Sequence, residues 1–267
     1  MRRLAGEKVA LAKRYGWTGP PFCPKILAGL FGIRCKEVDH DIGSEGRILL
    51  YPDGRPWIEY RSGRTKERQR FTVFHELAHT FFPDFCELVP HAYQRAGADP
   101  EDEFEKLCDI AASEMLLPIA EFRGHSYGLP VVCCEAIQKL SALYQASPDA
   151  TIRRFVEMHE NLPCAAVFLT DQKGDYQGRG PLWVQYCYRS SPFKGYFPGG
   201  TTPPWNSVAV HCLGEGTGVT PSAKETWWIS QKPRSYLVQA IRLPAVPENP
   251  SYPKVVALVL PSGYRAK

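Results

Sequence analysis

Two histidines and a glutamate lie within five residues of each other in the segment His75-Glu76-Leu77-Ala78-His79. In an α-helix, side chains four residues apart lie on one face about one turn apart, so two imidazoles can reach the same metal ion. Glu76 points about 100° away from His75, which suits a carboxylate that contacts a water molecule beside the ion rather than the ion itself. The pattern predicts a zinc site with Glu76 as catalytic base. The alternative is a helix whose histidines only form hydrogen bonds in the core.

A catalytic zinc ion has three protein ligands and one open position. The segment 101–118, "EDEFEKLCDIAASEMLLP", has helical spacing and offers Glu105 and Asp109 four residues apart on one face. We expect Glu105 to be the third ligand and Asp109 to accept the free ring N–H of a ligand histidine, which sets its tautomer. Glu101 and Glu103 lie in the first helical turn, where acidic residues are ordinary solvated partners of the helix dipole.

A peptide-cleaving site would also need a hydrogen-bond donor for the oxyanion. His91, Tyr93 and His125 are candidates, although each is more commonly a side chain without a catalytic role. An edge strand beside the metal helix could bind an extended substrate. Either half of the predicted hairpin, "RILLY" or "WIEY", could be that edge.

The elements that must position these residues are mixed helices and strands. The hairpin spans 47–60, where apolar runs flank Asp53-Gly54, a strong turn signal. The metal helix spans 67–82 and ends at Pro83. Helical spacing also predicts helices over 4–16, 24–33, 131–145 and 149–159.

The composition changes after about residue 160, where thirteen of the 24 prolines and four of the six tryptophans lie. Short apolar runs separated by turns predict strands there. These runs are 164–170, 182–189, 207–213, 236–243 and 254–260. We therefore predict an α+β protein with a mainly helical domain that contains a small hairpin over 1–160 and a β-rich domain over 161–267.

Charge and cysteine content exclude several classes of protein. A net charge of +4 is too small to indicate nucleic-acid binding, and the basic stretch Arg61–Arg70 is typical of a solvated loop and first helical turn. The nine cysteines form no C-x-x-C pair and suit free thiols in a reducing cytosol. Neither a signal peptide nor an apolar run long enough for a membrane span is evident. We expect a cytoplasmic protein.

The same residues carry a resemblance to a known family. The segments "RQRFTVFHELAHTFF" and "EKLCDIAASEMLLP" resemble the ImmA/IrrE zinc metallopeptidases, a gluzincin-like HExxH family. Weaker similarity runs through "GPPFCPKILAGLFGI" and "LSALYQASPDATIRRFVEMH", so the resemblance covers about 15–160. It departs from the family's second helix at two packing positions, where Cys108 stands for alanine and Ala111 for phenylalanine.

The resemblance implies roles for the matching positions. His75 and His79 match the metal histidines, Glu76 the catalytic base, Glu105 the third ligand and Asp109 its supporting acid. It also implies a second domain that is sometimes a GAF-like sensor, and a protein substrate, often a helix-turn-helix transcriptional repressor.

The resulting hypothesis is a zinc endopeptidase that cleaves such a repressor in a stress or mobile-element response, without direct contact to nucleic acid or membrane. Two alternatives are a zinc-containing regulator that does not cleave, and a toxin–antitoxin or phage-defence component that is triggered through its C-terminal domain. The oligomeric state, the activating signal and the cleaved bond stay open.

Overall fold

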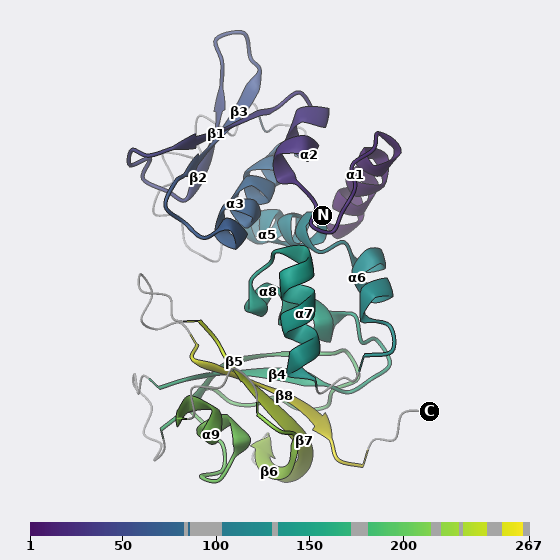
Figure 1. The fold of residues 1–267 in the computed structure, drawn as a ribbon, viewed down its shortest axis with the longest axis vertical. Helices are drawn as coiled ribbons and strands as arrows, with labels where there is room; N and C mark the ends of the chain where they lie inside the picture. Colours follow the sequence, from purple (N-terminus) through teal and green to yellow (C-terminus); the bar gives the residue numbers. More distant parts are fainter. Residues whose placement is uncertain are drawn as a thin grey trace. The chain divides into compact units, whose positions relative to one another are not determined.

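The computed structural model describes residues 1–82, 85, 103–129, 133–171, 181–214, 220–229, 232–244 and 253–263. The chain divides into two compact units (Figure 1). The first unit comprises 1–124 and 141–150, and the second comprises 125–140 and 151–267. Each unit is considered by itself below. The predicted division into a metallopeptidase domain over 1–160 and a regulatory domain over 161–267 stays a prediction.

The first unit is mainly helical with a small sheet. Its elements are α1 (Arg2–Arg14), α2 (Pro24–Leu30), β1 (Arg34–Val38), β2 (Gly46–Leu50), β3 (Pro56–Arg61), α3 (Lys66–His79), α5 (Glu103–Leu116) and most of α6 (Ile119–Ser126). Helices α7 (Cys134–Tyr144) and α8 (Pro148–Glu157) are shared between the units, because the division falls within each of them. The predicted helices near 4–16, 24–33, 131–145 and 149–159 are confirmed within the described residues.

The three-stranded sheet has the order β1-β3-β2. Strands β2 and β3 form the predicted antiparallel hairpin, in which Ile48 pairs with Ile58. Gly54 adopts φ +81° at the turn, a conformation that glycine reaches without steric cost. Strand β1 pairs with β3 in parallel. The sequence did not predict β1, because its residues "RCKEV" lack an apolar alternation.

Helix α3 is held by its start and by one apolar face. The Thr65 side chain accepts the backbone N–H of Arg68 at 3.3 Å, a typical N-cap bond. Phe74 is fully buried, and its ring centroid lies 6.3 Å from that of Trp17, whose ring is tilted against Phe22 at 4.7 Å. Helix α3 also packs against α5. It also contacts α2, β2 and β3.

Helix α5 brings small residues to its buried side. Cys108, Ala111 and Ala112 are all fully buried, as is Ala78 of α3. Small side chains allow two helices to approach closely, because nothing separates their backbones beyond a methyl or thiol group. The pair α3 and α5 therefore forms the rigid base of the site described below.

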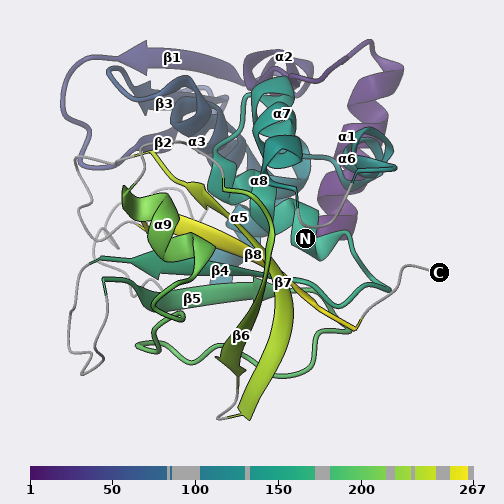
Figure 2. The same cartoon turned by 60° about the horizontal axis from the view of Figure 1, so that its bottom comes forward.

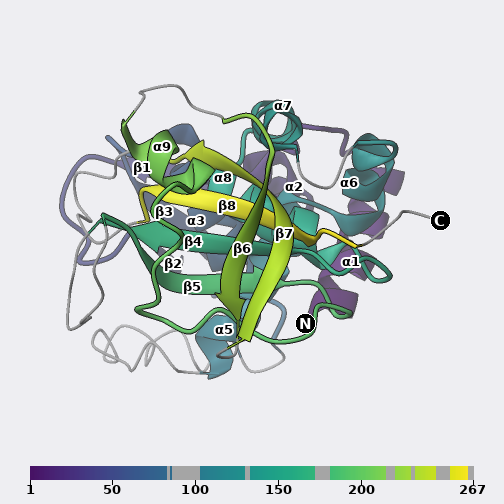
Figure 3. The same cartoon turned by 90° about the horizontal axis from the view of Figure 1, so that it is seen from below.

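The second unit is built on a five-stranded antiparallel sheet. The strands are β4 (Ala165–Thr170), β5 (Trp183–Arg189), β6 (Ala223–Ile229), β7 (Lys232–Arg242) and β8 (Val255–Pro261), in the order β5-β4-β8-β7-β6. Figure 3 shows the sheet twisting, with β6 and β7 turning away from the direction of β4 and β5. Short helix α9 (Val208–Gly214) lies against β7 and β8 (Figure 2). Buried valines, alanines and aromatic residues fill the core between them.

The prediction of a strand over 207–213 is wrong, because this segment forms α9. Ala209 and Cys212, three residues apart, are fully buried, whereas His211 is exposed. The start of the helix is stabilised by two side chains: Glu225 accepts the N–H of Val208 at 2.7 Å, and Ser207 accepts the N–H of Ala209 at 3.1 Å. Seven residues with two valines suit either period, so tertiary contacts decided the outcome.

The structure confirms a mixed α+β protein with a helical N-terminal region, a small three-stranded sheet and a five-stranded antiparallel sheet in the C-terminal part. The four other predicted strands in the C-terminal part are present, while β6 was not predicted. Within the described ranges, no helix has the length and apolar character that crossing a membrane requires. The described cysteines are all free thiols, and four of the eight are buried.

Candidate metal centre

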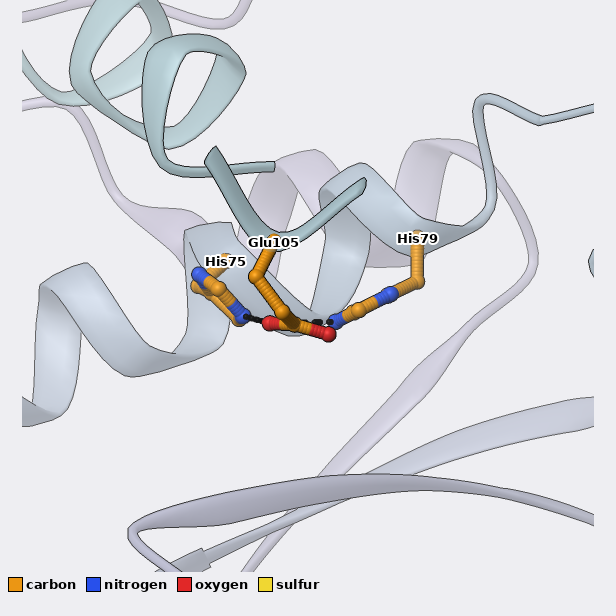
Figure 4. Close-up of side chains that lie close together, drawn as sticks. All are labelled: His75, His79 and Glu105. Carbon is orange, nitrogen blue, oxygen red and sulfur yellow. Dashed lines mark hydrogen bonds and ion pairs between the residues drawn. The ribbon is translucent and has the colours of Figure 1, made fainter. Parts of the chain in front are cut away.

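Three side chains converge where α3 meets α5. His75 and His79 extend from one face of α3, and the carboxylate of Glu105 from α5 lies between their rings (Figure 4). His75 Nε2 lies 3.0 Å from Glu105 Oε2, and His79 Nε2 lies 4.0 Å from the same oxygen. One nitrogen or oxygen from each residue falls within 4.8 Å of the others. Four-residue spacing on one helix and a single acid from its neighbour thus produce a compact donor set.

The donor set fits a small cation such as zinc. Zinc binds imidazole nitrogens and carboxylate oxygens at about 2.0–2.2 Å, so atoms that ligate one ion lie within about 4.5 Å of each other. The observed atoms are already within or near this range, and each histidine directs its Nε2 atom to the centre. Two imidazoles and one carboxylate leave one position of a tetrahedral ion open.

The opposite ring nitrogens of both histidines also have partners on α5. His75 Nδ1 lies 2.8 Å from Asp109 Oδ1. His79 Nδ1 lies 3.5 Å from the Sγ atom of Cys108. The structure therefore brings Asp109 to the ring nitrogen that the sequence analysis required, and it adds a thiol contact that the sequence analysis did not anticipate.

The two histidines have opposite electrostatic environments. Burial lowers the pKa of His75, but the hydrogen bonds to Asp109 and Glu105 outweigh it and raise that pKa to about 10. Burial and the positive charge of His75 lower the pKa of His79 to about 4. The hydrogen bond from His75 also lowers the pKa of Glu105. Without a cation, a protonated His75 therefore supplies the positive charge between these acids.

Glu76 lies outside the donor set, about 100° round α3 from His75, and is buried. Its side chain is 8% exposed, and burial raises its pKa to about 7 against the opposing effect of a charged His75. Glu76 interacts electrostatically with both His75 and Glu105. A carboxyl group with this pKa can take up and release a proton near neutral pH.

Strand β2 approaches Glu76 closely at Gly46. A β-carbon at Gly46 would collide with the Thr72 methyl group and lie 3.1 Å from Cγ and Oε1 of Glu76. The absence of a side chain at Gly46 therefore lets β2 run directly past the Glu76 carboxylate. A glycine within a predicted strand is a known sign of such an approach, although "GRILL" alone does not reveal what is approached.

The remaining candidates are placed differently or lie outside the described residues. Glu103 is exposed in the first turn of α5, as expected for a solvated acid. His125 is exposed at the end of α6. Glu101, His91 and Tyr93 lie outside the described residues. The oxyanion donor and the roles assigned to His75, Glu76, His79, Glu105 and Asp109 stay predictions.

Comparison with solved structures shows a likeness in fold. A search of curated proteins returned no match. Among eleven similar chains of solved structures is a Mycobacterium tuberculosis transcriptional regulator, which aligns with 98% of this chain and 77% of its own, with 15% sequence identity and a TM-score of 0.61. At this identity, the likeness concerns the fold.

A family model covers the part of the chain that contains the donor set. The model describes an IrrE N-terminal-like domain of peptidase family M78, and it matches residues 38–156. This range includes α3, with both histidines and Glu76, and α5, with Glu105 and Asp109. Residues 38–156 thus match the IrrE N-terminal-like domain of the ImmA/IrrE family.

Proposed function

We propose that the protein is a zinc-dependent endopeptidase that cleaves a transcriptional repressor. The observation that carries this proposal is the joint placement of a His-His-Glu donor set and a buried glutamate beside it. A purely structural metal site has no need of an extra carboxylate with a pKa near 7. The presence of a peptidase-family domain over the same residues supports the assignment.

In this proposal, His75, His79 and Glu105 would hold zinc through the atoms that face one another. When bound, the ion would supply a water molecule with a pKa lowered from about 15.7 to about 7 and a positive charge for the peptide carbonyl group. Asp109 accepts the Nδ1–H of His75 at 2.8 Å and keeps that ring oriented. Glu76 accepts a proton from the attacking water and returns it to the amine that leaves.

Strand β2 is the proposed binding edge for an extended substrate. Because β3 lies between β1 and β2, "WIEY" belongs to the central strand, and "RILLY" belongs largely to an edge strand. Of the two edge strands, β2 is the one that passes Glu76 at Gly46. A peptide added to this edge would carry its backbone past the carboxylate that has to reach it.

The proposed substrate is a helix-turn-helix transcriptional repressor in a stress or mobile-element response. Direct binding to nucleic acid is not part of the proposal, since arginines of the basic stretch pair with carboxylates. Arg64 and Arg68 both contact Glu45, and Arg61 contacts Asp41. The five-stranded sheet suits a GAF-like sensor that could trigger cleavage, including in a toxin–antitoxin or phage-defence setting.

The test compares Glu76→Gln with the exposed Glu103→Gln. Cleavage of a helix-turn-helix regulator encoded beside the gene is followed by mass spectrometry, and zinc content is measured in parallel. We expect Glu76→Gln to retain zinc and to reduce cleavage by about 10²–10⁴-fold, because a general base contributes that much. Glu103→Gln should cleave normally. Zinc binding with no cleavage by the unaltered protein would favour a regulator that does not cleave.

A further inference from the structure

The two histidines of the donor set have unequal partners behind them. An imidazole that binds a cation through Nε2 must carry its proton on Nδ1. Near the centre of a protein, that N–H needs an acceptor, because an unpaired buried donor costs about 1–3 kcal/mol. For His75 the acceptor is the carboxylate of Asp109 at 2.8 Å. The Nδ1–H group of His79 needs an acceptor among the residues around its ring.

Several groups among the described residues lie around the ring of His79. Its Nε2 atom faces Glu105, and its ring lies 5.0 Å from the ring of His75 and 5.2 Å from that of Phe104. The ring of Phe104 has no lone pair to offer, and the two ring nitrogens of His75 face Asp109 and Glu105. The Sγ atom of Cys108 lies 3.5 Å from Nδ1, within hydrogen-bond distance for sulfur. Cys108 and His79 are both buried, so bulk water does not replace this contact.

We propose that Cys108 is a positioning residue, whose sulfur accepts the Nδ1–H of His79 and thereby reserves Nε2 of that ring for the metal. This inference rests on the proposed metal site but not on peptide cleavage. Cys108 acts only through His79 and does not itself join the donor set, which contains His75, His79 and Glu105.

The helical geometry of α5 explains how one turn can serve both rings. Glu105, Cys108 and Asp109 are related as positions i, i+3 and i+4, which lie on one face of a helix. His75 and His79 are one turn apart on the facing helix. Glu105 therefore reaches the centre, Asp109 reaches the outer nitrogen of the first ring, and Cys108 reaches the outer nitrogen of the second.

The thiol makes this support weaker than the carboxylate. Sulfur is a weak acceptor, whereas hydrogen bonds to an ionised carboxylate are about twice as strong as neutral ones. The protein therefore binds its proposed ion through one strongly supported and one weakly supported histidine. Removing an outer partner of a ligand histidine typically lowers metal affinity 10–100-fold. For removal of the Cys108 thiol we expect the lower end of this range, a decrease in zinc affinity of about tenfold.

The experiment uses two substitutions that remove the acceptor but differ in volume. Cys108→Ala leaves a small space, and Cys108→Val keeps the site filled with an apolar group. Zinc affinity is measured by competition with a chromophoric chelator, and Cys134→Ala is the control for loss of a buried thiol elsewhere. We expect both Cys108 variants to bind zinc about tenfold more weakly and Cys134→Ala to match the unaltered protein. Affinity within twofold of the unaltered protein for Cys108→Val would overturn the proposal, since packing alone would then explain the thiol.

The decisive part of a second measurement uses the unaltered protein and so does not require a variant to fold. Side-chain nitrogen NMR of the metal-free protein distinguishes the two tautomers of a neutral histidine. We expect His79 to carry its proton on Nδ1, and the share of that tautomer to fall in Cys108→Ala. Finding the proton on Nε2 in the unaltered protein would overturn the proposal. Neither measurement involves proteolysis. The proposed role of Cys108 can therefore be confirmed or overturned even if the protein does not cleave the proposed substrate.

Discussion

The buried polar side chains of the two units make different kinds of hydrogen bonds. In the second unit they serve the backbone: Ser190 donates to the carbonyl of Leu162 and accepts the N–H of Cys164, while Thr220 accepts the N–H of Ala240. Gln239 accepts the N–H of Cys134 at 2.7 Å. Such bonds satisfy backbone groups that strand ends and helix starts leave without a partner.

The polar side chains between α3 and α5 instead contact one another. His75 contacts Asp109 and Glu105, and His79 contacts Cys108. These bonds join side chains and not backbone groups, so the secondary structure does not depend on the cluster. Gathering ionisable groups without structural need is typical of a functional site. From this difference we predict that substitutions in the core of the second unit mainly change stability, whereas substitutions in the cluster mainly change metal binding.

The largest effect is expected from Trp227→Ala in the second unit. Trp227 is buried against Phe197, with ring centroids 5.7 Å apart. Removing it should lower the free energy of unfolding of this unit by about 3–5 kcal/mol, because a large cavity remains. Urea denaturation followed by circular dichroism measures the loss. Trp205→Ala is the control, since Trp205 is 77% exposed and should change stability by less than about 0.5 kcal/mol. Equal effects of the two substitutions would contradict the assigned core.

Next in size is Glu105→Gln, which removes one proposed ligand without changing the shape of the side chain. We expect zinc affinity to fall by more than about 100-fold, beyond the range for partners outside the donor set. The metal-free fold should persist, as judged by circular dichroism. Glu103→Gln lies on the same helix and should bind zinc normally. Zinc affinity within tenfold of the unaltered protein would remove Glu105 from the donor set.

Gly46→Ala tests the close approach between β2 and Glu76. The new methyl group would meet Thr72 and Glu76, so we expect a loss of about 3 kcal/mol, the upper range for overpacking. Adding Thr72→Ser should recover part of the loss by removing the methyl group that clashes. Gly29→Ala is the control, because a β-carbon there meets nothing within 4 Å. Urea denaturation should separate the two alanine variants, and matching curves would rule out the tight contact.

The smallest effect concerns the pH dependence of stability in the metal-free protein. Folding raises the pKa of Glu76 from 4.5 to about 7, so the native state loses stability as pH rises from 4.5 through 7. Glu76→Gln removes this loss. The stability of the variant relative to the unaltered protein should therefore rise by up to about 3 kcal/mol between pH 4 and pH 8. Chemical denaturation at both pH values with a chelator present measures it. A constant difference would show that Glu76 has an ordinary pKa.

Local patterns predicted much of the fold and the main residues of the candidate site. The spacing of His75 and His79 determines that both rings share one face of any helix containing them, whatever packs against it. The hairpin is likewise encoded by two apolar runs and Gly54, which adopts the positive φ that a tight turn requires. The strand prediction for segment 207–213 was wrong because its apolar pattern does not distinguish a strand from a short helix.

The sequence by itself determined which side chains could form a donor set and which helix carries each of them. Only the tertiary structure decided that β2 is an edge strand beside Glu76 and that Cys108 lies behind His79. The physical reason is the separation along the sequence over which each kind of contact acts. Helical periodicity relates residues a few positions apart, but the packing of α3 against α5 and β2 depends on contacts between segments about 30 residues apart, which no local pattern specifies.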